Sequence, residues 1–403
     1  MTTVLVAGAG QSGFQAAASL RDKGFAGRVV LIGDEPGVPY QRPPLSKQYL
    51  QGTAGVDALH LRPQDFFNDK DIELVDGRVA AINRAESTVT LEDGTSLEYD
   101  HLVLATGARN RPLPVPGADL EGVLGLRTRD DADSLRAALE QAKDVVVIGG
   151  GFIGLEFAAH AGRPVTVVEA QDRLLARVAT PEISAHFAAL HEQAGATLIL
   201  GHGVTALHGD GKVESVELTD GRRLPADLVV IGVGVLPETA LAEEAGLKVD
   251  NGIVVDEHLT TSDPKIFAVG DCANFPCVHA GQATRLESVQ NAVDQARWVA
   301  ATITGAPAPY DSVPWFWTDQ LGNKLQIAGI GTGADHLLVT GDKDAGKFSI
   351  LAFREDVLIA VESVNRPSDH VSARRLLAAT KPVTLDELRA AEFDLKGLAK
   401  SRS

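Results

Sequence analysis

The stretch TVLVAGAGQSGFQAAASL, residues 3–20, decides the fold of this chain. It begins as a short run of apolar residues, breaks into the glycines Gly8, Gly10 and Gly13, and continues as an alanine-rich, helix-like pattern. A strand, a glycine turn and a helix in this order can cradle the pyrophosphate of a dinucleotide, because backbone N–H groups at the helix N-terminus face the anion. The stretch therefore predicts a βαβ unit that binds a dinucleotide.

A second motif of the same kind occurs in DVVVIGGGFIGLE, residues 144–156, where the glycines are Gly149, Gly151 and Gly154. A single match to this pattern can arise by chance in a glycine-rich chain, and this chain has 40 glycines. Two matches, each between a strand pattern and a helix pattern, favour two real sites over chance. The chain is therefore expected to hold two different dinucleotides at once.

An acidic residue follows each motif at the end of the next predicted strand. Asp34 lies 21 residues beyond the first motif, and Glu169 lies 15 residues beyond the second. A carboxylate at this place accepts hydrogen bonds from both hydroxyls of an adenosine ribose. Because Glu169 would repel a 2′-phosphate, the second site is expected to favour NADH over NADPH. The shorter second spacing contains Gly162 and Pro164, which predict that the second helix ends early.

Further predicted strands end in residues of the same chemistry. HLVLATGA, residues 101–108, predicts a buried strand that ends in Ala-Thr-Gly, and DLVVIGVGVLPE, residues 227–238, repeats the pattern in the second unit. IFAVGD places Gly270 and Asp271 after another apolar strand. Asp271 is expected to accept a hydrogen bond from a polyol chain such as ribityl, and the alternative is an N-cap of a following helix.

The bulk composition bounds the classes of function. A length of 403 residues suffices for two or three domains, and a net charge of −17 argues against nucleic acid or an anionic membrane as partner. No apolar run reaches the roughly 18 residues of a membrane span, and no signal peptide is recognised, so a cytoplasmic protein is expected. The only cysteines, Cys272 and Cys277, exclude a disulfide framework and a four-cysteine metal site. The 11 histidines show no metal-ligand spacing.

The segment from Ser312 onward differs from the rest of the chain. VPWFWTDQ is followed by the strand patterns KLQIAGI, KFSILAF and VLIAVESV, and then by the helix-like SARRLLAA. Its 12 basic residues balance its 12 acidic ones, so the whole acidic excess lies in residues 1–311. The segment is expected to be a separate domain, and an acidic partner would dock there more readily than elsewhere.

Four motifs, GAGQSG, LVLATGA, GGGFIGLE and IFAVGD, resemble in this order the flavoproteins with two dinucleotide-binding domains, the class that includes glutathione reductase. PYQRPPLSKQYL (39–50), RLESVQNAVDQAR (285–297) and PWFWTDQ (314–320) narrow the resemblance to NADH-dependent ferredoxin reductases of bacterial oxygenase systems, the putidaredoxin reductase and biphenyl dioxygenase reductase family. The resemblance covers the whole chain and implies an α/β fold, with two Rossmann-like domains and a C-terminal α+β domain. The implied ranges are 1–112 and 240–311 for FAD, 113–239 for NADH, and 312–403 for the C-terminal domain.

The resemblance also implies the reaction, in which electrons pass from NADH through FAD to an acidic 2Fe-2S ferredoxin. That ferredoxin would serve a haem-thiolate monooxygenase or an aromatic-ring dioxygenase. Lys47 is implied to lie near the flavin and to pair with Glu156, and Trp317 to lie beside the flavin. The alternatives are a solvated lysine, and aromatic packing of PWFW between the C-terminal and FAD domains. Disulfide reductases of the class carry a redox-active cysteine pair where this chain has RPPLSK, which contains no cysteine. Cys272 and Cys277 instead follow the Gly270–Asp271 motif, so both are expected to be reduced structural thiols.

The remaining site residues are implied by their match to family positions. For FAD they are Gly8, Gly10, Ser12, Gly13, Asp34, Arg42, Lys47, Val79, Ala105, Thr106, Gly107, Arg129, Gly270, Asp271, Val289 and Trp317. For NADH they are Gly149, Gly151, Ile153, Gly154, Glu169, Arg177 and Gly232. For docking of the ferredoxin they are Arg297, Arg374 and Arg375, with Lys381 as a further candidate.

Two other interpretations stay open at this point. A rubredoxin reductase or an NADH oxidase of the same class would share both cradles and differ in the electron acceptor. A redox-sensing interaction protein like apoptosis-inducing factor would bind NADH slowly and act through partners, although the net charge weighs against DNA. A monomer or a weak homodimer is expected.

Overall fold

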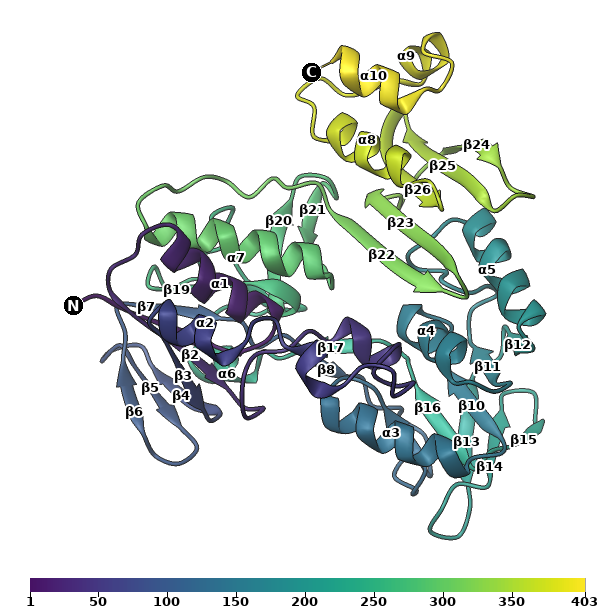
Figure 1. The fold of residues 1–403 in the computed structure, drawn as a ribbon, viewed down its shortest axis with the longest axis horizontal. Helices are drawn as coiled ribbons and strands as arrows, with labels where there is room; N and C mark the ends of the chain where they lie inside the picture. The colour runs from purple at the N-terminus through teal and green to yellow at the C-terminus, as the bar shows by residue number, and fades with distance from the viewer. Residues whose placement is uncertain (403) are drawn as a thin grey trace. The chain divides into compact units, whose positions relative to one another are not determined.

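The computed structural model describes residues 1–402 (Figure 1) and divides into two compact units. Unit 1 comprises Met1–Gln41, Asp57–Arg109 and Leu236–Pro314. Unit 2 comprises Arg42–Val56, Asn110–Val235 and Trp315–Ser403. The elements at which the chain passes from one unit to the other are η2 (Val56–Leu59), β8 (Ala108–Asn110) and β17 (Val235–Pro237).

Unit 1 is built on a five-stranded parallel sheet with the first strand of the chain at its centre. In sheet order the strands are β19 (Ile266–Ala268), β7 (His101–Leu104), β1 (Thr3–Ala7), β2 (Arg28–Gly33) and β3 (Ile72–Asp76). Four of the five residues of β1 are buried, because its run TVLVA is apolar on both faces. A continuous apolar run is typical of a strand that is covered on both sides.

Helices α1 (Gln11–Asp22) and α7 (Val289–Ile303) pack against each other in unit 1 (Figure 1). The buried residues of α1 include several small side chains, such as those of Ala16 and Ala17. α7 begins after Ser288, whose Oγ accepts a hydrogen bond from the Asn291 N–H at 3.1 Å and so caps the helix. The remaining elements of the unit are α2 (Gln64–Asp69), β4 (Val79–Asn83), β5 (Thr88–Leu91), β6 (Ser96–Glu98), α6 (Ala240–Glu244), β18 (Ile253–Val254), η3 (Gly270–Cys272), β20 (Ala273–Cys277) and β21 (Gln282–Thr284).

Unit 2 contains a second five-stranded parallel sheet of the same plan, again with the strand of the glycine motif at its centre. In sheet order its strands are β12 (Thr197–Leu200), β11 (Thr166–Glu169), β10 (Val145–Ile148), β16 (Leu228–Ile231) and β9 (Val123–Gly125). The accompanying elements are η1 (Pro43–Ser46), α3 (Arg129–Gln141), α4 (Phe152–His160), α5 (Pro181–Gln193) and the antiparallel strands β13 (Val204–His208), β14 (Ser215–Leu218) and β15 (Arg223–Pro225).

The helix after the second glycine motif ends early, as the sequence predicts. α4 has 9 residues, whereas α1 has 12. Gly162 follows it with a φ of +70°, a left-handed conformation that suits glycine, and Pro164 precedes the start of β11. Glu169 is nevertheless the last residue of β11, so the shortened connection still brings the acid to the end of its strand.

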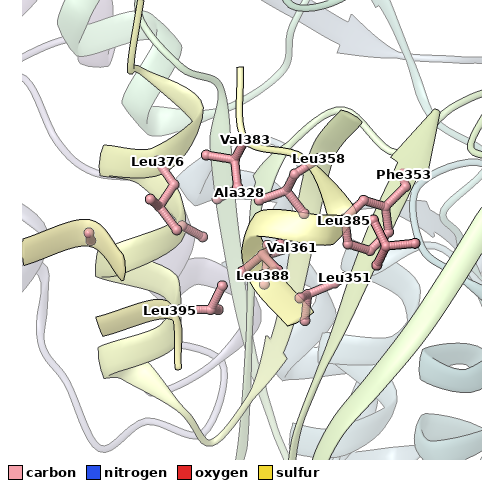
Figure 2. Close-up of a cluster of buried hydrophobic side chains, with 12 residues drawn as sticks. Ala328, Leu351, Phe353, Leu358, Val361, Leu376, Val383, Leu385, Leu388 and Leu395 are labelled. Carbon is pink, nitrogen blue, oxygen red and sulfur yellow. The ribbon is translucent and has the colours of Figure 1, made fainter. Parts of the chain in front are cut away.

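The C-terminal segment of unit 2 forms an antiparallel sheet covered by three helices, which is an α+β arrangement. Its elements are β22 (Trp315–Gln320), β23 (Asn323–Gly329), β24 (His336–Asp342), β25 (Lys347–Arg354), β26 (Val357–Val364), α8 (Pro367–Leu377), α9 (Leu385–Ala390) and α10 (Leu395–Ser401). Figure 2 shows how Leu376, Leu388 and Leu395, one from each helix, gather with Leu351 and Val361 of the sheet in one buried cluster. The segment therefore has a hydrophobic core of its own.

Candidate functional site

The first glycine motif forms a turn between β1 and α1 in which each glycine has a different steric role. Gly8 has a φ of +110°, and a Cβ there would lie 2.2 Å from the carbonyl oxygen of Ala105. A Cβ at Gly13 would lie 1.8 Å from the carbonyl oxygen of Gly8, so the helix approaches the strand only without a side chain. A Cβ at Gly10, which directly precedes α1, would meet no protein atom within 4 Å. Gly10 therefore leaves the backbone open to a pyrophosphate.

The second glycine motif repeats these roles position by position. Gly149 has a φ of +111°, and a Cβ there would lie 2.4 Å from the carbonyl oxygen of Gly232. A Cβ at Gly154 would lie 2.2 Å from the carbonyl oxygen of Gly149. At Gly151 the nearest atom to a Cβ would be the Gly232 oxygen at 4.0 Å, so this position is again open. Both cradles thus fit a dinucleotide. The carbonyl oxygen of Gly232, after β16, lies against Gly149 as that of Ala105, after β7, lies against Gly8.

The two predicted ribose acids lie in different surroundings. Asp34 is exposed and directly follows β2, which ends at Gly33 and not at Asp34 as the sequence suggested. Glu169 is half-buried, and its Oε2 accepts a hydrogen bond from the Gly150 N–H at 2.6 Å. Its Oε1 accepts from the Gln171 N–H at 2.8 Å. The Glu169 carboxylate is therefore held against the glycine turn of its own cradle.

A third glycine of unit 1 contacts the first cradle. Gly270, in η3, has a φ of +78°, and a Cβ there would lie 2.7 Å from Oγ of Ser12 in α1. The Gly270 N–H donates to Oε1 of the buried Gln295 at 2.7 Å, which ties this turn to α7. The turn is followed by strand β20 and not by an α-helix. The alternative interpretation of Asp271 as an α-helix N-cap is therefore wrong.

The ion pair predicted between Lys47 and Glu156 is present in unit 2. Nζ of Lys47, which follows η1, lies 2.8 Å from Oε2 of Glu156 in α4. Both residues are buried, with 9% and 7% exposure. Glu156 also accepts hydrogen bonds from Ser46 Oγ at 2.7 Å and from Thr318 Oγ1 at 2.6 Å. Lys47 is therefore not the solvated lysine of the alternative interpretation, since a buried charge requires such partners.

The aromatic residues of PWFW line β22 and contact other parts of unit 2. The ring of Phe316 stacks on Phe152 of α4, with 4.3 Å between ring centroids. Trp315 contacts Trp317, with 5.5 Å between centroids, and the ring of His370 in α8. Phe316 therefore packs against the helix that follows the second glycine motif.

The other predicted cofactor residues lie at several places in the two units. In unit 2, Arg42 donates a hydrogen bond to the Arg127 carbonyl oxygen at 2.6 Å, and Arg129 is the first residue of α3. Arg177 places its guanidinium 3.3 Å from where a Cβ of Gly234 would lie. Of the remaining predicted residues, Thr106 donates a hydrogen bond to the Glu238 carbonyl oxygen at 2.7 Å, and Gly107 has a φ of +70°. Val79 begins β4 and Val289 begins α7. Ile153, in α4, is 37% exposed.

The arginines predicted to dock a partner are all exposed. Arg297 lies on α7 of unit 1, 3.5 Å from the carboxylate of Asp294. Arg374 and Arg375 lie on α8 of unit 2, where the Arg374 guanidinium is 4.7 Å from the centroid of the Trp315 ring. The further candidate Lys381 forms an ion pair with Glu387 at 3.4 Å.

Cys272 and Cys277 are both free and buried. Burial raises the pKa of each thiol, so neither is poised as a reactive thiolate. Within residues 1–402, no three His, Cys, Asp or Glu side chains are grouped as a metal site would require. Over the same residues, none of the helices combines the length and the apolar character needed to cross a membrane.

Sequence reasoning missed several polar residues that surround the ion pair. Ser46 and Thr318 lie 110 and 162 residues from Glu156 in the chain. Gln320 and His191 continue the hydrogen-bonded group beyond Thr318. One sequence feature could have indicated two of them: Ser46 and Thr318 lie within the RPPLSK and PWFWTDQ motifs, next to Lys47 and Trp317.

Comparisons with known proteins give a consistent result. Residues 2–296 match the family model described as pyridine nucleotide-disulphide oxidoreductase, and residues 315–399 match the model described as reductase C-terminal. The chain is 50% identical to rhodocoxin reductase of Rhodococcus erythropolis, over 98% of this chain and 93% of that protein. It resembles the crystal structure of the ferredoxin reductase for the CYP199A2 system from Rhodopseudomonas palustris, with a TM-score of 0.96, 50% identity and full coverage of both chains.

A second solved structure is a covalent complex of putidaredoxin reductase with putidaredoxin. The TM-score is 0.94 and the identity 40%, over 100% of this chain and 99% of that one. The predicted resemblance and the predicted fold class are thereby confirmed.

Proposed function

The chain belongs to the pyridine nucleotide-disulphide oxidoreductase family, and from this premise we propose that it is an FAD-containing, NADH-dependent ferredoxin reductase. FAD and NAD(P)H are the cofactors of this family. The observation that carries the proposal is the pair of cradles in one chain, each open at its second glycine and closed at the other two. One cradle would hold the flavin dinucleotide and the other the nicotinamide dinucleotide.

The proposed division of the chain assigns one part to each cofactor and one to the C-terminal domain. FAD would be bound by residues 1–112 and 240–311, NADH by residues 113–239, and residues 312–403 would form the C-terminal domain. The hydrogen bonds that hold Glu169 at the Gly150 turn support its role as the ribose acid. A carboxylate there discriminates against the 2′-phosphate of NADPH, so NADH is the proposed donor.

The proposed acceptor is a 2Fe-2S ferredoxin that serves an oxygenase. Bound FAD takes electrons from NADH in a pair and can release them singly, which a one-electron acceptor requires. RPPLSK lacks the cysteine pair of a disulfide reductase, and both cysteines of the chain are buried elsewhere. The relatives named as ferredoxin reductases and the complex with putidaredoxin support this acceptor.

We propose that Lys47, Glu156 and Trp317 act at the reacting rings, and that three arginines dock the partner. Lys47, held by Glu156, would place a positive charge beside the flavin as it takes up negative charge, and electrostatic stabilisation of this kind favours the reduced ring. Trp317 would cover the flavin. Arg297, Arg374 and Arg375 would attract an acidic ferredoxin against the overall charge of −17. The proposed location is the cytoplasm, where NADH is available and where Cys272 and Cys277 would stay reduced. The proposed oligomeric state is a monomer or a weak homodimer.

The test begins with the colour of the purified protein. We expect a yellow protein whose flavin absorbance is bleached by NADH more readily than by NADPH. Reduction of cytochrome c by NADH is then measured alone and with a panel of 2Fe-2S ferredoxins, a rubredoxin and oxygen. Only the true acceptor should convert slow electron transfer into fast turnover.

Each alternative has its own outcome in this experiment. Fast turnover with rubredoxin or oxygen alone would identify the acceptor of the competing enzyme functions. Slow reduction by NADH with a long-lived charge-transfer band would favour a redox-sensing interaction protein. A colourless protein that neither binds added FAD nor oxidises NADH would refute the proposal.

A further inference from the structure

The carboxylate of Glu156 receives a different set of donors on each of its oxygens. Oε2 accepts from Ser46 Oγ at 2.7 Å and lies 2.8 Å from Lys47 Nζ. Oε1 accepts from Thr318 Oγ1 at 2.6 Å, and no other donor to it is found within residues 1–402. Both oxygens of the carboxylate are therefore assigned, one to the lysine side and one to strand β22.

The hydrogen bonds continue from Thr318 into the protein interior. Nε2 of Gln320 donates to Thr318 Oγ1 at 3.0 Å, and Oε1 of Gln320 lies 2.9 Å from Nε2 of His191 in α5. Thr318, Gln320 and His191 are each at most 1% exposed. Water cannot replace a lost partner easily at this depth, so each bond constrains the next.

The directions of these bonds follow from the carboxylate. An ionised carboxylate only accepts, so Thr318 must donate to Glu156 and can only accept from Gln320. The amide nitrogen of Gln320 therefore faces Thr318, and its oxygen faces His191. His191 then carries a hydrogen on Nε2. Burial lowers the pKa of His191, which favours the neutral ring with that single hydrogen.

Thr318 and Gln320 lie on the opposite face of β22 from the neighbouring Trp317. Thr318 and Gln320 are two residues apart in β22 and therefore point to the same face, whereas Trp317 and Asp319 point to the other. Thr318 and Gln320 are buried, and Trp317 is only partly buried. Strand β22 therefore provides both the Thr318 hydroxyl that donates to Glu156 and Trp317, the residue proposed to cover the flavin.

We propose that Thr318 is a positioning residue for electron transfer, which keeps the Glu156 carboxylate turned toward Lys47. The terminal torsion of a glutamate is broad, so without a donor on Oε1 the carboxylate could rotate and Lys47 would lose its fixed partner. Gln320 and His191 hold the Thr318 hydroxyl in the donating direction. The inference rests on the proposed function, because it assigns Lys47 a role in flavin reduction.

The test compares Thr318→Val, which keeps the side-chain shape but removes the donor, with Thr318→Ser, which keeps the donor. Thr340→Val on β24 is the matched control, because within residues 1–402 the Thr340 hydroxyl donates one long hydrogen bond, to the Ser349 carbonyl oxygen at 3.5 Å, and none to a charged group. We expect Thr318→Val to bind FAD fully and to keep its KM for NADH. Its rate of flavin reduction in stopped flow should fall about tenfold, the effect of one lost hydrogen bond to a charged group.

A second measurement is independent of turnover. The midpoint potential of the bound flavin should become more negative in Thr318→Val, because a displaced Lys47 stabilises the reduced flavin less. Thr318→Ser should restore both the reduction rate and the potential, and Thr340→Val should match the wild type in both.

Two results would overturn the positioning role. One is wild-type reduction and potential in Thr318→Val. The other is equal loss of FAD in both Thr318 variants, which would show a purely structural role. A wild-type protein that NADH does not reduce would instead refute the proposed function itself, so the two failures are distinguishable.

Discussion

Gly8 and Gly10 stand two residues apart, yet a methyl group at each would have opposite consequences. At Gly8 the methyl group would collide with the Ala105 carbonyl oxygen, and the φ of +110° is strained for any other residue. At Gly10 it would meet no protein atom and would project into the space that the proposed dinucleotide needs. The same contrast separates Gly149 from Gly151 in the second cradle.

Gly10→Ala is therefore expected to fold normally and to lose FAD, with a dissociation constant raised at least about tenfold by the blocked backbone contact. Gly151→Ala should keep FAD and raise the KM for NADH by a similar factor. Flavin content, FAD titration and steady-state kinetics measure these effects. Full FAD occupancy in Gly10→Ala would contradict the assignment of the first cradle.

Lys47→Ala is expected to retain FAD and to be reduced by NADH about tenfold to a hundredfold more slowly. A cation about 4 Å from a developing charge contributes at most roughly 4 kcal/mol at an effective dielectric of about 20, which bounds the effect. Stopped-flow reduction measures it, with Lys70→Ala as control because Lys70 pairs with Asp22 on the surface. Reduction of Lys47→Ala at the wild-type rate would remove Lys47 from the mechanism.

At the scale of elements, a buried carboxylate joins the C-terminal sheet to the start of a helix. Glu362 of β26 accepts hydrogen bonds from the N–H of Thr180 at 3.1 Å and from its hydroxyl. Thr180 is the N-cap residue of α5, where a negative charge interacts favourably with the helix dipole. Burial nevertheless raises the pKa of Glu362 to about 7, with Glu182 adding to the rise and Thr180 and Arg173 opposing it.

The sign of the resulting pH dependence is opposite to that of an ordinary paired carboxylate. Because the folded state holds this proton up to about pH 7, and the unfolded chain releases it near the ordinary glutamate pKa of 4.5, stability falls as pH rises between these values. Glu362→Gln, which mimics the protonated group, should be as stable as the wild type at pH 5 and more stable at pH 8. Urea unfolding at both pH values measures this, and equal stabilities at pH 8 would contradict it.

At the scale of the whole molecule, the charge distribution bears on partner choice. The acidic excess lies in residues 1–311, whereas residues 312–403 are neutral overall. An acidic ferredoxin would be repelled by most of the surface, so each exposed arginine at the docking site should strongly affect its association rate.

Arg297→Glu is expected to raise the KM for ferredoxin about tenfold and to leave ferricyanide reduction unchanged. Folding should be little affected, because Arg297 is exposed and an ion pair with an exposed arginine contributes little to stability. Lys23→Glu, which makes the same charge change at another exposed site of unit 1, is the control. Equal loss of both activities in Arg297→Glu would count against a docking role.

Much of this protein could be predicted from local patterns. The glycine spacings, the apolar strands before them and the early end of α4 at Gly162 and Pro164 all depend on neighbouring residues, and local steric rules fix their structure. The boundary of β2 differed by one residue, since strand ends depend on pairing.

The sequence by itself determined two dinucleotide cradles, the acids that follow them and the absence of a cysteine pair at RPPLSK. Only the tertiary structure decided what surrounds Glu156, because Ser46 and Thr318 come from segments more than a hundred residues away. It also decided that Phe316 stacks on Phe152 and that Glu362 caps α5. Such contacts depend on how separate elements pack against one another, and no periodicity or spacing along the chain encodes that arrangement.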